Sequence, residues 1–372
     1  MKFAIITHVI HGESQGTYFG YAPYVREMNV WLKHVDEVLI VAPLREVIPT
    51  SIDLDYEHSR ITFRKVPEFH LLNFKSTLKA IFLLPKISFE IYQAMKAADH
   101  IHLRCPGNMG LLGCVVQLLF PKKYKTAKYA GNWDAKAKQP LSYRLQKWIL
   151  NNTFLTKNMQ VLVYGEWEKS SGNIKPFFTA SYFEIEKTSV VSRNLKDTIS
   201  FLFVGTLSQG KQPLYVVQLV EELKKKDYNV QLSLYGEGDE RVNIEKYITH
   251  NQLENCVFIK GNQSQETIKK AYSENHFIVL PSLSEGWPKV VAEGMFWGCL
   301  PIASKVSCVP NMLGNGERGL LLNLNLNEDV SQMESLINEE KVYQEKVKMA
   351  IEWSRYYTFD VFEQEIKKLL QS

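Results

Sequence analysis

Short apolar runs recur along the chain, and each ends in a small or polar turn. A first series lies at 3–9, 38–43, 101–104, 128–132 and 161–165, and a second at 201–206, 230–236, 257–261, 277–282, 300–304 and 319–323. Segments with helical periodicity, such as 213–227 and 241–251, separate many of these runs. Continuous apolar strands that alternate with helices indicate parallel sheets covered on both faces. The two series therefore predict two doubly wound domains.

The length of the chain supports this division. With 372 residues it exceeds the usual size of a single hydrophobic core. The break falls near 180–198, which is polar and lacks a clear period. We predict a first domain at 1–190, a second at 191–350 and a terminal helix at 351–372. The predicted fold class is α/β, with two Rossmann-like domains that face each other across a cleft.

Composition narrows the class of protein. The hydrophobic fraction of 45% and the charged fraction of 23% are ordinary for a globular chain. The longest apolar stretch, 110–120, falls far short of the roughly 20 residues that span a bilayer. The segment 1–10 reads as a buried strand, because no cleavage site typical of a signal peptide follows it. The five cysteines form no C-x-x-C pair, which argues against disulfide and zinc frameworks and predicts a cytoplasmic protein.

Charge is distributed unevenly along the chain. Residues 1–200 hold 26 basic and 17 acidic residues, a net charge of +9, whereas residues 201–372 hold 18 and 23, a net charge of −5. Much of the basic excess lies at 122–147, where eight cations accompany only Asp134. A solvated face and a patch for anionic lipid or an acidic substrate both fit this pattern. No nucleic-acid-binding motif accompanies the charge, so no nucleic acid is expected as a partner.

Two motifs resemble ligand sites without the context that such sites need. The segment 314–319 reads GNGERG, but a dinucleotide fingerprint follows a strand and opens a helix, and here a strand-like GLLLN follows. We therefore predict a turn between a helix and a strand. The DLD at 53–55 has the form of a metal clamp, yet it lies in a polar segment between early strands. We predict an exposed loop or edge hairpin there, and no metal site.

Ligands of open α/β sheets bind beyond the carboxyl ends of the strands. After the strand at 201–206, Gly205 is followed by Lys211 and by a helix that opens near Pro213, an arrangement that suits a diphosphate as well as a plain turn. Gly236 occupies the equivalent place after the strand at 230–236, where a tight turn is the favoured explanation. These strand ends are the candidates for ligand contact.

The segment LSEGWPKVVAEG carries the strongest signal. Glu285 directly follows a buried strand, and Glu293 lies eight residues later among apolar and small neighbours. A helix would separate the two by roughly 12 Å, which is about the length of a nucleoside diphosphate that carries a sugar. Carboxylates accept hydrogen bonds from vicinal hydroxyls, so one could hold a hexose and the other a ribose.

These motifs occur in a familiar order. FVGTLSQGK, LYGEGDER, VFIKGNQSQETIKKAY, FIVLPSLSEG, CLPIAS and GERGLLL accompany an E-x7-E signature in EGWPKVVAEGMFWG. The second half resembles the retaining glycosyltransferases of family 4, which have the GT-B fold, over about 199–325. The first half resembles the same family more weakly, as its acceptor domain. The resemblance implies that the closing helix crosses back to the first domain.

The resemblance also implies roles for particular residues. Glu285 and Lys211 would be catalytic, with Glu285 on the donor sugar, Lys211 on the diphosphate and Glu293 on the ribose. Backbone amides from Gly286 to Lys289 would contact sugar or phosphate, and the loop from Lys260 would lie beside the base. The implied donor set is Gly16, Gly205, Thr206, Lys211, Gly236, Lys260, Gly261, Asn262, Glu285, Gly286, Trp287, Pro288, Lys289 and Glu293. Neither a metal nor a cofactor beyond the nucleotide-sugar substrate is implied.

The sequence departs from the family's pattern in both halves. Thr206 stands where the family often has an arginine, so that Lys211 would act with another cation such as Lys289, or phosphate binding would be weaker. The segment 128–134 contains no histidine where the family often places one. Gly16 is the best candidate for the donor-facing position of the first domain, with His8 and His11 as nearby polar side chains.

We therefore expect a retaining, metal-independent transferase. It would move a sugar from a UDP- or GDP-linked donor to a glycan or lipid-linked glycan, in bacterial surface polysaccharide synthesis. The basic first domain would contact the inner face of the plasma membrane. Two alternatives stay open: a sugar-nucleotide epimerase or hydrolase on a related fold, and a non-catalytic subunit of the same fold.

Overall fold

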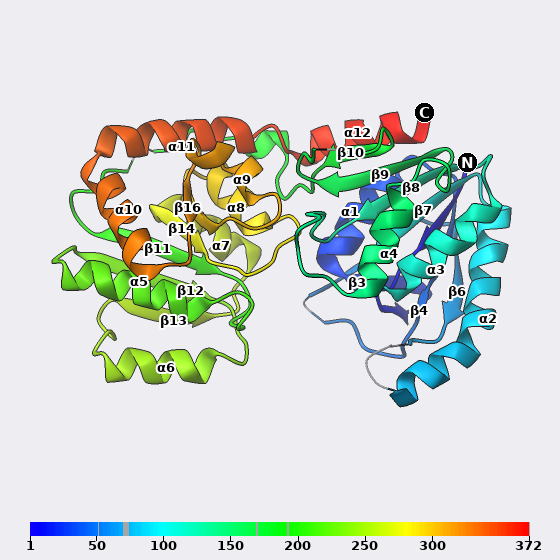
Figure 1. The fold of residues 1–372 in the computed structure, drawn as a ribbon, viewed down its shortest axis with the longest axis horizontal. Coiled ribbons are helices and arrows are strands. Elements are labelled where there is room, and N and C mark those ends of the chain that lie inside the picture. The colour runs from blue at the N-terminus through cyan, green and yellow to red at the C-terminus, as the bar shows by residue number, and fades with distance from the viewer. Residues whose placement is uncertain (51, 70–73, 169, 192, 372) are drawn as a thin grey trace. The chain divides into compact units, whose positions relative to one another are not determined.

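A computed structural model describes residues 1–50, 52–69, 74–168, 170–191 and 193–371, without side-chain detail at 74–81. The chain forms two compact units (Figure 1). The first comprises Met1–Phe178 and Phe362–Ser372, and the second comprises Thr179–Val361. The boundaries thus differ from those that we predicted at 190 and 350. Residues after 178 belong to the second unit because Ser181 bonds to Glu293 and Tyr182 packs on Phe296.

The first unit is built on a seven-stranded sheet in which all paired strands are parallel. The strand order across the sheet is β10 (Ile174–Phe177), β9 (Met159–Tyr164), β8 (Tyr124–Tyr129), β7 (His100–Cys105), β1 (Lys2–Ile6), β4 (Glu37–Pro43) and β6 (Ile61–Val66). The five inner strands are buried almost throughout, whereas the edge strands β10 and β6 are only partly buried.

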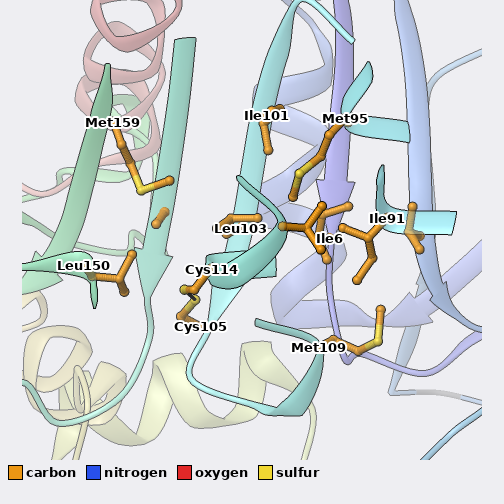
Figure 2. Close-up of a cluster of buried hydrophobic side chains, with 14 of the residues drawn as sticks. Ile6, Ile91, Met95, Ile101, Leu103, Cys105, Met109, Cys114, Leu150 and Met159 are labelled. Atoms are coloured by element: carbon orange, nitrogen blue, oxygen red, sulfur yellow. Dashed lines mark hydrogen bonds between the residues drawn. The ribbon is translucent and has the colours of Figure 1, made fainter. Parts of the chain in front are cut away.

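Helices cover both faces of this sheet. On one face α2 (Phe74–Ala97), α3 (Asn108–Val116) and α4 (Leu141–Leu150) lie side by side, as Figure 1 shows. Their apolar side chains pack on the strands in the core that Figure 2 shows, where Ile91 and Met95 of α2 lie near Ile6 and Leu103. Elsewhere α12 (Phe359–Gln371) joins α1 (Ala22–Leu32) through an ion pair between Glu363 and Lys33 at 3.5 Å.

A small antiparallel sheet packs against α1. It consists of β2 (His11–Ser14), β3 (Thr17–Tyr21) and β5 (Asp53–Asp55). The turn between β2 and β3 consists of Gln15 and Gly16, whose φ angles of 50° and 79° are both positive, as a two-residue hairpin requires.

The second unit is built on a six-stranded parallel sheet. Its strand order is β13 (Val257–Gly261), β12 (Val230–Tyr235), β11 (Ile199–Val204), β14 (Phe277–Leu280), β15 (Leu300–Ser304) and β16 (Leu320–Leu322). Its helices are α5 (Pro213–Lys225), α6 (Arg241–His250), α7 (Gln265–Glu274), α8 (Lys289–Phe296), α9 (Val309–Met312), α10 (Leu326–Asn338) and α11 (Glu340–Ser354). Short 3-10 turns occupy Gln117–Leu119 (η1), Glu184–Glu186 (η2) and Gly314–Gly316 (η3).

The prediction of two doubly wound α/β domains is confirmed, and a strand overlaps each predicted run, although β8 ends at Tyr129, early in the run predicted at 128–132. The segment GNGERG contains η3 and leads from α9 into β16, so the predicted helix-to-strand turn is also confirmed. The periodicity did not reveal β2, β3, β6 or β10, which are short or only partly buried. None of the helices in the described part of the chain is long and apolar enough to cross a membrane.

Candidate functional site

The second sheet changes winding direction between β11 and β14. From β11 the chain adds β12 and β13 on one side, whereas β14, β15 and β16 extend the sheet on the other. The loops that follow β11 and β14 therefore leave from neighbouring strands at the same carboxyl edge. Such a switch point is where open α/β sheets bind their ligands. The two loops carry Lys211 and Glu285, respectively, and lead into α5 and α8.

Lys211 and Glu285 meet at this switch point. The Lys211 Nζ donates to Glu285 Oε1 at 2.5 Å, although the residues lie 74 positions apart. The Glu285 side chain is 8% exposed and that of Lys211 is 33% exposed. The Leu283 amide also donates to the Gly210 carbonyl at 2.9 Å, which ties the two loops together through their backbones. The prediction had placed both residues after strands, and the structure adds that they form one ion pair.

Residues that follow β15 hold the loop from Glu285 to α8 in place by hydrogen bonds. Ser307 Oγ and Cys308 Sγ donate to the Gly286 carbonyl at 3.2 Å and 3.1 Å. Burial raises the pKa of Cys308 to about 12, so the thiol keeps its proton and remains a donor. The Trp287 ring stacks on Trp353 at 6.1 Å between centroids. The Trp287 side chain therefore has a packing role.

Glycines allow the neighbouring loops to approach closely. The Gly205 amide donates to the Tyr235 carbonyl, and the Gly236 amide donates to the Gly261 carbonyl, both at 2.9 Å. A Cβ on Gly236 would lie 1.9 Å from the Gly205 carbonyl oxygen, and the residue has φ +143°. Close backbone packing thus explains why a glycine stands at position 236. Gly236 and Gly205 form one backbone surface.

Glu293 lies on α8 and is held at both of its oxygens. Ser181 Oγ donates to Oε1 at 2.5 Å, and the Tyr272 hydroxyl donates to Oε2 at 3.1 Å. Burial, and then the Glu293 charge, raise the pKa of Tyr272 well above its usual value, so this hydroxyl stays protonated and donates. Glu293 is half-buried, as its apolar neighbours in the sequence predicted.

The predicted base-side loop lies at the end of β13. Lys260 is exposed with its ammonium 4.9 Å from the centre of the Phe258 ring, and Gly261 turns the chain with φ +65°. Asn262 is exposed, and the Gln263 amide donates to the Lys260 carbonyl at 2.8 Å.

Thr206 is exposed at the start of the loop after β11, and its carbonyl accepts from the Ser208 amide at 2.9 Å. Pro288 and Lys289 stand at the start of α8, and neither α5 nor α8 has a side-chain hydrogen-bond cap among the described residues. The free backbone N–H groups in the first turn of each helix can therefore donate hydrogen bonds to an anion.

The first unit has its own switch point between β1 and β7. A cavity of about 280 Å³ lies at the carboxyl ends of β1, β4, β6 and β7, and its lining includes His8, Glu68, Phe69, Asn108 and Tyr143. Burial, and then the charge of Arg104, lower the pKa of His8, so its ring is neutral at pH 7. This cavity offers a neutral ring nitrogen, an amide, a phenol and an aromatic face.

The remaining candidates of the first unit have structural explanations. Gly16 occupies the hairpin turn, where a Cβ would meet nothing within 4 Å. His11 is buried and bonded to the Tyr56 hydroxyl at 2.9 Å, and burial lowers its pKa to about 4. Asp53 accepts from the Thr50 amide and hydroxyl, so it closes a turn at the edge strand β5. No cluster of three metal-ligating side chains occurs among the described residues.

The second unit is similar in sequence to known glycosyl transferases. Residues 184–353 match the family model of glycosyl transferases group 1. The matched segment contains Lys211, Glu285 and Glu293, together with the whole six-stranded sheet. Over 171 residues the chain is 27% identical to the uncharacterized glycosyltransferase MJ1178 of Methanocaldococcus jannaschii, covering 46% of this chain and 47% of that one. It is 28% identical to the amylovoran biosynthesis glycosyltransferase AmsK of Erwinia amylovora over 145 residues, 37% and 36% of the two chains. The alignments thus span less than half of these relatives.

A solved structure matches the full length. Anabaena Alr3699/HepE, in complex with UDP and glucose, superposes with a TM-score of 0.68 over 100% of both chains at 14% identity. This likeness, with the two parallel sheets, shows the two-domain GT-B fold.

Sequence reasoning missed several residues that hold the site. Ser181 and Tyr272 bond Glu293, while Ser307 and Cys308 fix the Gly286 carbonyl. Ser181 lies in the polar break at 180–198, and no local pattern marks it as a site residue. The first-unit cavity had a usable signal, because the turn residues Pro106 and Gly107 directly follow a buried strand.

Proposed function

We propose that this protein is a retaining glycosyltransferase that moves a sugar from a nucleotide-diphosphate sugar to a glycan or lipid-linked glycan. The observation that carries the proposal is the Lys211–Glu285 ion pair at the switch point of the second unit. It lies within the segment that matches glycosyl transferases group 1. The likeness to an amylovoran biosynthesis enzyme supports a role in bacterial surface polysaccharide synthesis.

The donor diphosphate would bind where Lys211 meets the uncapped start of α8. Lys211 is partly exposed, so its ammonium can turn from Glu285 to a phosphate without leaving the site. Glu285, released from the pair, would accept hydrogen bonds from sugar hydroxyls. The N–H groups of the first turn of α8, including Lys289, would add the positive end of the helix dipole.

The ribose would bind at Glu293 without displacing its present partners. A carboxylate has about four acceptor positions, and Ser181 and Tyr272 occupy one on each oxygen. Two positions remain for vicinal ribose hydroxyls. Ser181 and Tyr272 would then be positioning residues that fix the carboxylate for the nucleotide.

The base would lie beside Lys260, Gly261 and Asn262, with Gly205, Thr206 and Gly236 forming the backbone surface beneath the diphosphate. When the glycosidic bond breaks, negative charge develops on the departing diphosphate. Lys211 and the helix start would stabilise that charge, and no metal ion is required for this step. Thr206 lacks the positive charge that an arginine would supply at this position, and Lys289 would supply a positive charge in its place.

The acceptor would bind in the first unit. The cavity beyond β1 and β7 combines Phe69, whose ring suits the apolar face of a sugar, with the polar atoms of His8, Asn108 and Tyr143. Hydrogen-bonding groups around an aromatic face, with the Glu68 carboxylate held in an ion pair with Arg45, are suited to a carbohydrate. Gly16 would take part only through the backbone of its hairpin turn.

The test measures binding first and catalysis second. Purified protein is titrated with UDP and GDP by calorimetry and screened with nucleotide sugars by thermal shift, since a ligand that binds only the folded state raises the melting temperature. Lys211→Met should weaken binding of the nucleotide, and Glu285→Gln should weaken binding of the nucleotide sugar, each at least about tenfold, the effect of losing roughly 1.4 kcal/mol. Lys225→Met is the matched control. Lys225 also pairs with a glutamate, Glu221 at 2.8 Å, but it lies at the C-terminal end of α5, whereas Lys211 precedes the start of that helix.

Each outcome has a defined meaning. Transfer to an acceptor with the anomeric configuration kept, as seen by NMR, and unchanged by a chelator would support the whole proposal. Free sugar or an epimerised donor formed without any acceptor would identify a hydrolase or epimerase instead. No binding of either nucleotide by the wild-type protein would identify a non-catalytic subunit.

A further inference from the structure

We propose that α4 and its flanking loops form a surface that binds an anionic lipid bilayer. The inference rests on the exposure and charge of the first unit and does not depend on the proposed transfer reaction. It commits to one partner, the negatively charged surface of a membrane.

The first observation is an apolar stripe on the outer side of α4. Leu141, Leu145 and Trp148 are 77%, 45% and 61% exposed. With Arg144 they follow the spacing i, i+3, i+4 and i+7, which places them on one side of a helix. Gln146, Ile149 and Leu150 are buried on the opposite side. The helix therefore has apolar residues on the face that contacts the core and also on the face that does not.

The apolar surface continues beyond the C-terminal end of α4. Phe154 is 76% exposed in the following loop. The Gln117 side chain donates to the Leu155 carbonyl at 3.1 Å, which joins this loop to η1. The two residues next to Gln117, Leu118 and Leu119, are also exposed. Apolar side chains thus extend over two neighbouring segments, and an isolated exposed residue would need no such explanation.

The second observation is the charge around the stripe. Residues 135–165 contain no acidic residue, and 100–165 contain only Asp134. The structure shows which cations are available. Half of the eight predicted at 122–147 serve the fold: Lys125 and Lys128 are buried, Lys123 bonds three carbonyls at the end of α2, and Lys147 bonds the Asp134 carbonyl.

The other cations lie on the surface. Lys122, Lys136, Lys138, Arg144 and, just beyond, Lys157 are exposed. Lys136 and Lys138 lie in the segment that leads into α4, and Lys157 lies over the Phe154 ring at 5.1 Å. Each basic residue near an anionic bilayer contributes about 1 kcal/mol of attraction.

Apolar and basic side chains that alternate on one surface suit a lipid headgroup region, where Trp and Leu enter the boundary and Lys and Arg meet phosphates. A protein partner would need acidic residues opposite at least four cations. Tyr143, on the same helix, lines the first-unit cavity. Membrane contact by α4 would therefore place that cavity beside the bilayer, where a lipid-borne molecule could enter it.

The experiment compares vesicles of phosphatidylcholine with and without phosphatidylglycerol, by co-sedimentation of the full-length protein. Binding is expected only with phosphatidylglycerol, and it should weaken when salt rises from about 0.1 M to about 1 M, because the Debye length falls from about 10 Å to about 3 Å. Arg144→Glu with Trp148→Gln should lower the partition coefficient about tenfold or more.

The matched control is Val242→Gln with Lys246→Glu on α6. Like the α4 variant, this control changes one exposed apolar residue and one exposed basic residue four positions apart. The two residues lie in the second unit. Equal losses in both double variants, or equal binding to neutral vesicles, would overturn the inference. A third result would also overturn it: the wild-type protein is a dimer, the α4 variant is a monomer, and neither binds vesicles. The surface would then join two copies of the chain.

Discussion

Gly236→Ala is expected to destabilise the second unit more than any change on its surface. The new Cβ would lie 1.9 Å from the Gly205 carbonyl oxygen, whereas real Cβ contacts are essentially never below 3.0 Å. One of the two backbones must move by more than 1 Å. Both are tied by hydrogen bonds at 2.9 Å, from Gly205 to Tyr235 and from Gly236 to Gly261.

The magnitude follows from three contributions. A side chain at φ +143° costs on the order of 1–3 kcal/mol. Breaking one of the two hydrogen bonds costs about 1 kcal/mol. Displacement of the packed loop adds on the order of 1 kcal/mol, as for other overpacked sites. Together they predict a loss of about 3–5 kcal/mol, which is a large part of the stability of an ordinary domain.

The assay is urea unfolding, followed by hydrogen exchange of peptides from β11 and β12 so that the second unit is observed by itself. Gly210→Ala is the control, because its Cβ would meet nothing within 4 Å and its φ lies outside the strained range. It should change the free energy of unfolding by less than about 1 kcal/mol. If the two variants unfold alike, within about 0.5 kcal/mol, the close approach of these loops does not limit stability and the reasoning fails.

Three further changes test buried polar groups. Lys128→Met should cost about 3–5 kcal/mol in urea unfolding, because it removes a buried cation 3.3 Å from Glu27; a smaller loss would mean that Glu27 is satisfied by its other neighbours. Burial lowers the pKa of His102 to about 3 from 6.5, so the unfolded chain binds the proton first, and the stability present above pH 6.5 is lost as pH falls towards 3. His102→Asn should therefore reduce the pH slope of stability by about 1.4 kcal/mol per pH unit between pH 6 and 4, measured by unfolding at several pH values, and an unchanged slope would contradict it. Tyr272→Phe should cost about 1.5–3 kcal/mol, by loss of its bond to Glu293, and should also weaken nucleotide binding in calorimetry; unchanged affinity would deny it a positioning role.

Much of the fold was accessible from local pattern. The apolar runs that became β11, β12, β13, β14 and β15 are continuous, and turn residues such as Gly205 and Gly236 follow them closely. Strands buried on both faces need such runs, so the pattern identifies them without knowledge of their partners. Short or partly exposed strands such as β6 and β10 lack this requirement and were missed.

The candidate site was accessible only in part. The sequence located Lys211 and Glu285 at strand ends, but not their contact, because strand order decides which loops are neighbours. The second carboxylate shows the same limit. Glu293 could be read as half-buried from its neighbours, whereas Ser181, 112 positions away, entered the site only through folding.

The sequence alone therefore determined the elements, the fold class and the residue types at the carboxyl ends of the strands, since these depend on short-range periodicity and turn chemistry. The tertiary structure decided which charges are bound and which are available. Lys125 and Lys128 look like members of one basic patch with Lys136 and Lys138, yet strand β8 buries the first pair and the loop after it exposes the second. Burial is a property of the elements packed around a residue, and those elements come from distant parts of the chain.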